Sequence, residues 1–98
     1  MIRVVLPTHL GRLANTQRET KVAVDGTPTI GVLLDVLETQ YPMLRGTVRD
    51  HVTKERRPFI RFFVCGEDWS HEPPDSPLPS QIVSGEEPVR IIGALAGG

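Results

Sequence analysis

One amphipathic helix pattern in the middle of the chain most constrains its fold. Apolar side chains recur there at the helical spacing of i, i+3, i+4, i+7 and i+11, at Ile30, Leu33, Leu34, Leu37 and Tyr41. The Thr29 hydroxyl can accept an orphan backbone N–H of the first turn. Pro42 ends the pattern, because the residue before a proline avoids helical geometry. The sequence therefore predicts one long helix over Thr29–Gln40 with one face turned to a core.

Alternating strand patterns flank this helix on both sides. They cover Ile2–Leu6, Thr20–Val24, Pro58–Cys65 and Val89–Ile92, with a short strand near Trp69. In this order, strand one should pair with strand two like a hairpin and with the last strand in parallel. The predicted class is α+β: a β-grasp, or ubiquitin-like, roll with a mixed sheet of four to five strands and one main helix packed on one face.

The inward-facing positions of these elements predict the core. It comprises Ile2, Val4, Leu6, Val22, Val24, Ile30, Leu33, Leu34, Leu37, Ile60, Phe62, Val64, Leu78 and Ile91. His9–Glu19 is expected to be a loop anchored by Leu10 and Leu13. Ser70–Ser80 is expected to be a proline-rich loop pinned by Leu78.

Length, charge and composition exclude several classes of function. A chain of 98 residues fits one domain. A net charge of −1 gives no basic field for nucleic acid or an anionic membrane, and no apolar run is long enough to span a membrane. The single cysteine, Cys65, cannot form a disulfide within the chain, which agrees with a location in the reducing cytoplasm. The histidines and Cys65 lack metal-ligand spacing, so no metal site is expected. Without a glycine-rich phosphate loop, no bound cofactor is expected either.

The last six residues, Gly93-Ala94-Leu95-Ala96-Gly97-Gly98, form a small, uncharged segment after the final strand. We expect residues 1–92 to form the domain and 93–98 a flexible tail. Because glycine has no Cβ atom, Gly97 and Gly98 would fit the narrow channel of an enzyme. The terminal carboxylate of Gly98 is thus the predicted reacting group; the alternative is a frayed end without a role.

A partner surface is predicted on the sheet face away from the helix. Strand alternation places Phe63 there with Phe59 and Arg61, and we expect Trp69 to lie close enough to join them. Ile92 should face solvent just before the tail. Clustered apolar side chains mark interfaces, whereas isolated ones are ordinary. Along the tail, a partner would contact Ala94, Leu95 and Ala96.

A basic loop between the helix and the third strand has two interpretations. It is a solvated surface or a docking patch for an acidic partner. Its cationic residues are Arg45, Arg49, Lys54, Arg56 and Arg57.

Several motifs resemble the sulfur-carrier proteins related to the small subunit of molybdopterin synthase and to the sulfur carrier of the thiamine pathway. The resemblance runs through Gly26-Thr27, Leu33-Leu34-Asp35-Val36-Leu37-Glu38, Tyr41-Pro42-Met43-Leu44-Arg45, Phe63-Val64-Cys65-Gly66-Glu67-Asp68, Ser76-Pro77-Leu78, Gly85-Glu86-Glu87 and Ile91-Ile92-Gly93-Ala94-Leu95-Ala96-Gly97-Gly98. The tail is the most specific of these motifs.

The resemblance implies a carrier rather than an enzyme. An E1-like adenylating enzyme would use ATP and Mg²⁺ to activate Gly98, a persulfide or sulfide source would convert it to a thiocarboxylate, and a sulfur-accepting enzyme would take the sulfur. The acceptor is open among a molybdopterin precursor, thiazole, an activated amino acid in cysteine synthesis, and tRNA. Two alternatives also stay open: a ubiquitin-like modifier joined through Gly98 to partner lysines, and a binding module with an inert tail.

Overall fold

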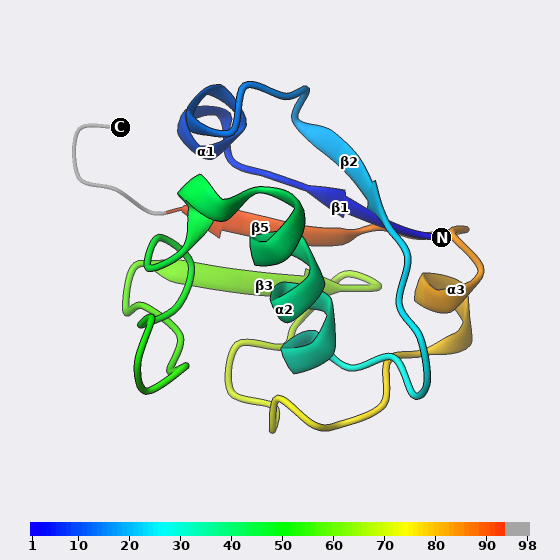
Figure 1. The fold of residues 1–98 in the computed structure, drawn as a ribbon. Coiled ribbons are helices and arrows are strands. Elements are labelled where there is room, and N and C mark those ends of the chain that lie inside the picture. The colour runs from blue at the N-terminus through cyan, green and yellow to red at the C-terminus, as the bar shows by residue number, and fades with distance from the viewer. Residues whose placement is uncertain (94–98) are drawn as a thin grey trace.

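The computed structural model describes residues 1–93. Its elements, in chain order, are β1 (Ile2–Val5), α1 (Thr8–Leu13), β2 (Glu19–Val22), α2 (Ile30–Gln40), the 3-10 helix η1 (Pro42–Leu44), β3 (Ile60–Val64), β4 (Glu67–Asp68), α3 (Ser80–Val83) and β5 (Val89–Gly93) (Figure 1). Within this range, no helix is long and apolar enough to cross a membrane. The predicted order of the main elements is confirmed.

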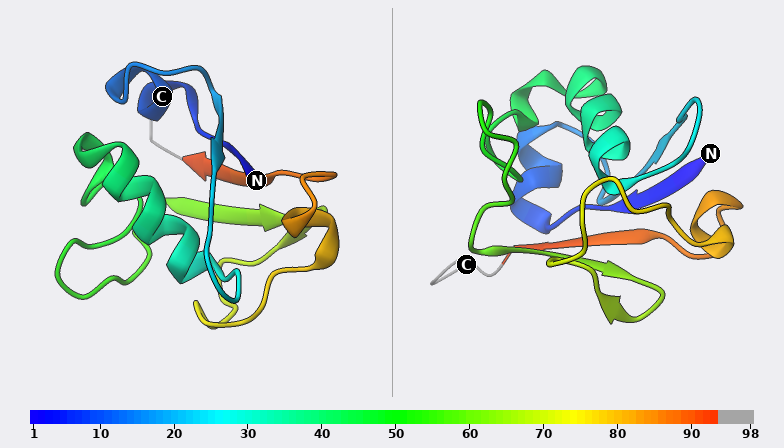
Figure 2. Two further views of the ribbon diagram at one scale, coloured as in Figure 1. Left: turned by 45° about the vertical axis from the view of Figure 1, so that its right-hand side comes forward. Right: turned by 90° about the horizontal axis from the view of Figure 1, so that it is seen from below.

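The strands form one mixed sheet in the order β2-β1-β5-β3-β4. β1 runs antiparallel to β2, with Ile2 opposite Val22, and parallel to β5, with Val4 opposite Val89. These are the pairings expected from the sequence. Seen along the sheet, α2 lies over one face, and no helix of residues 1–93 covers the opposite, outer face (Figure 2).

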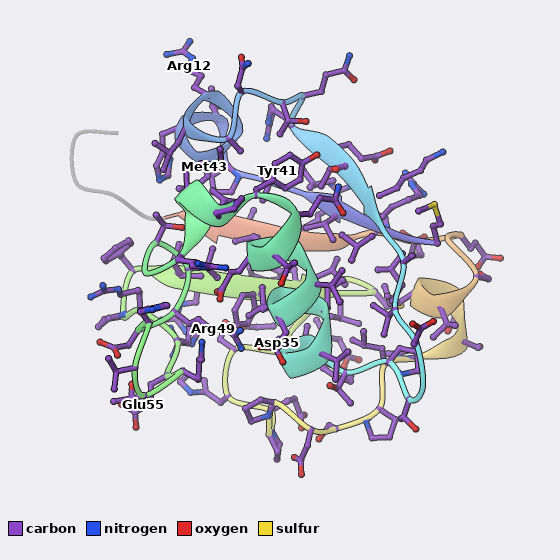
Figure 3. All side chains as sticks on the ribbon, viewed as in Figure 1. Arg12, Asp35, Tyr41, Met43, Arg49 and Glu55 are labelled. Atoms are coloured by element: carbon purple, nitrogen blue, oxygen red, sulfur yellow. The ribbon has the colours of Figure 1, made fainter. Side chains whose placement is uncertain are left out.

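The helix α2 begins and packs as its sequence pattern predicts. The Thr29 hydroxyl accepts a hydrogen bond from the Val32 backbone N–H at 3.1 Å. The apolar stripe is buried, and Tyr41 at its end is half-buried with its hydroxyl 2.9 Å from the Thr20 hydroxyl. Hydrogen bonds with Thr16 and Thr20 hold the pKa of Tyr41 below its ordinary value. Tyr41 thereby links the end of α2 to β2 (Figure 3).

The predicted core is confirmed at every position but one. Val24 is half-buried and packs against the core from outside. The expected anchor Leu10 is buried in the core, which also contains residues that the sequence analysis left out: Ala14, Leu44, Val48, Ile82 and Val89.

The segment 9–19, expected to be a loop, contains a short helix, and another short helix follows the proline-rich loop, which Leu78 pins as expected. In the segment of residues 9–19, α1 and its C-cap bring the side chains of Leu10 and Ala14, four positions apart, into the core. The prediction that Leu13 anchors this segment is wrong, since Leu13 is 50% exposed. At the end of the proline-rich segment, α3 begins at Ser80 and buries Ile82 completely.

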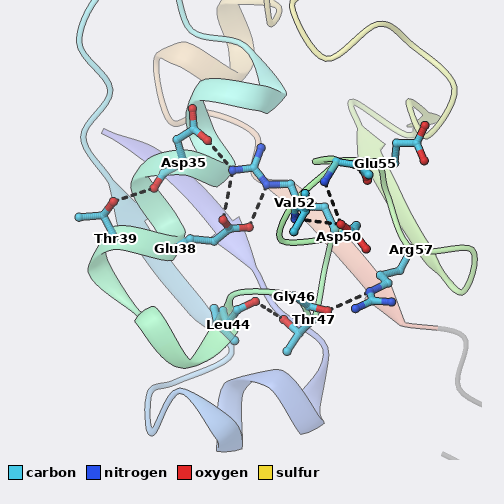
Figure 4. Close-up of polar contacts among 12 residues, drawn as sticks. Asp35, Glu38, Thr39, Leu44, Gly46, Thr47, Asp50, Val52, Glu55 and Arg57 are labelled. Carbon is cyan, nitrogen blue, oxygen red and sulfur yellow. Dashed lines mark hydrogen bonds and ion pairs between the residues drawn. The ribbon is translucent and has the colours of Figure 1, made fainter.

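Neither interpretation of the basic loop holds for Arg49, which is a buried structural residue. Its guanidinium donates to both carboxylate oxygens of Glu38, at 2.9 and 3.1 Å, and also pairs with Asp35 (Figures 3 and 4). The side chains of Arg49 and Glu38 are each only 6% exposed. Burial disfavours the charged guanidinium, but its hydrogen bonds to Glu38 and Asp35 outweigh that effect and raise the pKa of Arg49.

Arg56 and Arg57 likewise serve the fold. Arg56 donates to the backbone carbonyls of Ile60 at 2.6 Å and Ser70 at 3.1 Å. Arg57 donates to the carbonyl of Gly46 at 2.9 Å. These contacts join the loop to the first residue of β3, to Ser70 and to itself, so the side chains of Arg56 and Arg57 are engaged within the fold.

Candidate functional site

The site is built at the C-terminal end of β5. This strand lies in the middle of the sheet, between β1 and β3, so it is held from both sides. Its last residue, Gly93, pairs with Ile60 of β3. The sequence analysis placed Gly93 at the start of the tail; in the structure it ends a central strand. The rest of the predicted tail, Ala94, Leu95, Ala96, Gly97 and Gly98, lies outside the described residues.

A hollow opens beside this end of β5, because β1 is shorter than its neighbour. The pairing of β1 with β5 stops at Val5 and Arg90, and the chain then turns at Pro7 into α1. Figure 1 shows α1 and the end of β5 on the same side of the molecule, away from the N-terminus. The space has a volume of about 430 Å³, and we call it the tail-root hollow. Its lining residues are Pro7, Thr8, His9, Arg12, Arg18, Ile91, Ile92 and Gly93.

Gly93 and His9 approach each other closely across this hollow. A Cβ atom built on Gly93 would lie 2.8 Å from His9 Cε1 and 3.5 Å from Pro7 Cγ. Because a separation below 3 Å is a steric clash, any larger residue at position 93 would displace the His9 ring. The missing side chain of Gly93 therefore lets the exposed His9 ring lie against the end of β5.

The charged side chains of the hollow come from a segment that the sequence analysis took for a loop. Arg12 lies on α1 and points outward from it (Figure 3). Arg18 lies just before β2, and its Nε donates to the Leu6 carbonyl at 3.4 Å. Sequence reasoning missed His9, Arg12 and Arg18 as site residues. The available signal was the Leu10–Ala14 spacing after Pro7, which is compatible with one short helix turned to the core.

The outer face of the sheet carries the apolar side chains that strand alternation predicts. Phe59 is 38% exposed, Ile92 is 41% exposed and Phe63 is half-buried. Ile92 lies opposite Arg61, and Phe63 lies opposite Arg90. Phe63 and Ile92 are thus diagonal neighbours on one face, and that face adjoins the tail-root hollow.

Trp69 does not join this patch. Its backbone N–H donates to the Phe62 carbonyl at 2.7 Å, and its side chain packs against the core. Together with Leu34 and Phe62 it lines a second hollow, of about 590 Å³, between the start of α2 and the 49–56 and 69–74 segments. Phe62 is a core-facing residue, so Trp69 lies on the helix side of the sheet, away from Phe63 and Ile92.

Groups of histidine, cysteine, aspartate or glutamate that could hold a metal ion are absent from residues 1–93. Cys65 is exposed at the turn between β3 and β4. Among the described residues, the candidate site is therefore a hollow with a cationic and apolar lining, beside strand β5, which leads to the tail.

Comparisons with known proteins agree on the architecture. No family model and no curated protein matches the chain. Among solved structures, SAMP1 of Haloferax volcanii, a small archaeal modifier protein, is 24% identical over 98% of this chain and 97% of its own, with a TM-score of 0.75. A chain of the BexX/CysO complex of Amycolatopsis orientalis is 18% identical over 100% of both chains, with a TM-score of 0.77. CysO of Mycobacterium tuberculosis is 21% identical over 97% of this chain and 100% of its own, with a TM-score of 0.75.

The chain has the β-grasp fold. The similarity extends across essentially the whole length of each β-grasp neighbour. The end of β5 and the tail-root hollow are consequently features of the β-grasp body itself.

Proposed function

We propose that the chain is a ubiquitin-like sulfur carrier whose reacting group is the C-terminal carboxylate of Gly98. One observation carries the proposal: the central strand of the sheet leads directly into a small, uncharged segment that ends in Gly97-Gly98. Fixing the root of the tail in the middle of the sheet would let a partner grip the body while the tail enters its channel. The shared β-grasp fold of SAMP1 and CysO supports this class of function.

The proposed chemistry proceeds in two steps on an E1-like enzyme. A carboxylate oxygen of Gly98 attacks the α-phosphorus of ATP, and pyrophosphate leaves with the broken P–O bond pair. Mg²⁺, held by the enzyme and the nucleotide, offsets the phosphate charge. Hydrosulfide, released from a persulfide donor by a thiol that ends as a disulfide, then attacks the acyl carbon. AMP leaves with the C–O bond pair, and loss of a proton gives the thiocarboxylate.

In this scheme the chain supplies surfaces and a carboxylate, while the enzyme binds ATP and Mg²⁺. The outer face, with Phe63 and Ile92, would contact the enzyme, and Ala94, Leu95 and Ala96 would lie in its channel. The thiocarboxylate would then donate sulfur to a sulfur-accepting enzyme of cofactor or cysteine biosynthesis. That one similar structure is of a complex, BexX with CysO, is in keeping with partner binding.

The second candidate is a ubiquitin-like modifier, in which a partner lysine rather than hydrosulfide attacks the activated Gly98. The similarity to SAMP1, a modifier protein by name, favours this alternative. Both functions share the adenylation step, so they differ only in the nucleophile.

Intact mass spectrometry separates the two candidates. The purified chain would be incubated with an E1-like enzyme of the same organism, ATP, Mg²⁺ and sulfide. Replacement of one oxygen by sulfur supports the carrier, and lysine conjugates formed with an extract of the same cells support the modifier. An unchanged mass in both assays would favour an inert tail.

A further inference from the structure

The tail-root hollow carries positive charge and no negative charge. Arg12 and Arg18 belong to its lining, which includes no aspartate or glutamate. Within residues 1–93, neither Arg12 nor Arg18 forms an ion pair. The whole chain has a net charge of −1, so this local excess is not a general property of its surface. The hollow is therefore suited to an anionic group.

The rest of the lining is apolar except for Thr8. Pro7 and Gly93 contribute, and the 41% exposed Ile92 belongs to both the hollow and the outer face. A small inorganic anion would use only the guanidinium groups. A carboxylate on a short aliphatic stem, with apolar neighbours in its own chain, would use both kinds of surface.

The position of the hollow indicates which molecule brings that carboxylate. Gly93 lines the hollow and also ends β5, so a protein that takes the tail passes directly over it. A nucleotide at the Gly98 carboxylate would be too distant when the tail is extended, because five residues span about 17 Å. The carboxylate that enters the hollow is therefore expected to belong to the partner protein.

We infer that the tail-root hollow binds an aspartate or glutamate side chain, flanked by apolar residues, of the protein that receives the tail. The inference rests on the proposed function, since it requires such a protein. Arg12 and Arg18 would pair with the carboxylate, and Pro7 and Ile92 would contact its neighbours. Charge pairs at the rim of an interface mainly speed association and fix orientation.

The test measures binding of the full chain to an E1-like enzyme of the same organism, first without ATP. Arg12→Glu and Arg18→Glu each reverse one charge of the hollow. Lys54→Glu is the matched control, because Lys54 is exposed in the 49–56 loop, outside both the hollow and the outer face, and the change in net charge is the same. Thermal unfolding of each variant establishes that the fold is retained.

We expect Arg12→Glu and Arg18→Glu to raise Kd by about tenfold or more at low salt, and Lys54→Glu by less than about twofold. The difference should shrink at high salt because rim charges are screened. Equal weakening by all three variants would overturn the inference. So would tighter binding or faster adenylation by Arg12→Glu, which would mean that the hollow holds the chain's own terminal carboxylate.

Adding ATP keeps the two proposals distinguishable. If the wild-type chain binds with the expected charge dependence but its mass never changes, the sulfur-carrier function fails and the docking inference stands. If the mass changes while Arg12→Glu and Arg18→Glu bind like wild type, the docking inference fails alone. Absence of binding by the wild-type chain overturns the inference.

Discussion

Gly93 and His9 meet at the end of β5 so closely that a Cβ atom on Gly93 would lie 2.8 Å from His9 Cε1. The contact joins the last residue of the central strand to α1. Any larger residue at position 93 would require this exposed ring to move.

We predict that Gly93→Ala lowers the free energy of unfolding by less than about 1 kcal/mol, because the exposed His9 ring can rotate away from the new methyl group. In a His9→Ala background the same change should cost nothing or stabilise slightly, since the clashing ring is gone. Urea unfolding of both single variants and the double variant measures this coupling. Additive effects of the two substitutions would show that the contact exerts no strain.

The buried Arg49–Glu38 pair predicts strong destabilisation when only one partner is removed. Arg49→Ala should cost about 3–5 kcal/mol, because it leaves the Glu38 carboxylate buried without its counter-ion. Replacing both, in Arg49→Met with Glu38→Leu, should cost less than the single change.

Asp35→Asn is the control for this pair. Asp35 also contacts Arg49, but its side chain is 65% exposed, so its loss should cost less than about 1 kcal/mol. Urea unfolding measures all three variants. An Arg49→Ala protein as stable as Asp35→Asn would contradict the structural role given to the buried pair.

The ionised carboxylate of Asp50 should stabilise the 49–56 loop, so this contribution to stability should depend on pH. Its carboxylate accepts hydrogen bonds from the backbone N–H groups of Thr53 and Val52, each at 2.8 Å, and these lower the pKa of Asp50. A carboxyl group with a lower pKa in the folded state stabilises the fold when ionised. The contribution is complete above the unfolded pKa, near 3.9, and is lost as the pH falls through the folded pKa.

Comparing wild type with Asp50→Asn isolates this effect, because the other carboxylates titrate in both proteins. The stability difference should be largest at neutral pH and should shrink below about pH 4. A difference that stays constant between pH 7 and pH 3 would show that ionised Asp50 does not stabilise the loop.

The sequence predicted the elements whose periodicity repeats over several turns or positions. The stripe from Ile30 to Leu37 and the alternation along β3 each offer repeated contacts with one core, and both fold as expected. In contrast, α1 has six residues. One pair of buried positions, Leu10 and Ala14, is too short a pattern to distinguish a single helical turn from an anchored loop.

The site was only partly predictable for a related reason. Alternation within a strand placed Phe63 and Ile92 on the outer face correctly. Trp69 follows a turn, and alternation along β3 does not predict which way a side chain beyond the turn will face. Trp69 packs on the helix side of the sheet. The role of Arg49 depends on Glu38 and Asp35 in a different element, and composition of the loop alone cannot show that pairing.

Substitutions on the outer face of the sheet should weaken binding to the enzyme without lowering the stability of the fold. Phe63→Ser and Ile92→Ser should each weaken binding to the E1-like enzyme by about tenfold, or about 1.4 kcal/mol. Val52→Ser is the matched control, because Val52 is 84% exposed in the 49–56 loop. Trp69→Ser should instead reduce stability, since Trp69 packs against the core. Calorimetric binding with unchanged affinity in both outer-face variants would contradict a docking role for this face.

The central claim is that sulfur is added at the C-terminal carboxyl group of Gly98. Mass analysis of the C-terminal peptide tests this claim most directly. After incubation with the E1-like enzyme, ATP, Mg²⁺ and sulfide, we expect one oxygen of Gly98 to be replaced by sulfur. Deleting Gly98 or adding one residue after it should abolish the change and leave thermal stability unaltered. Sulfur incorporated by the extended chain, or found anywhere other than Gly98, would contradict the account.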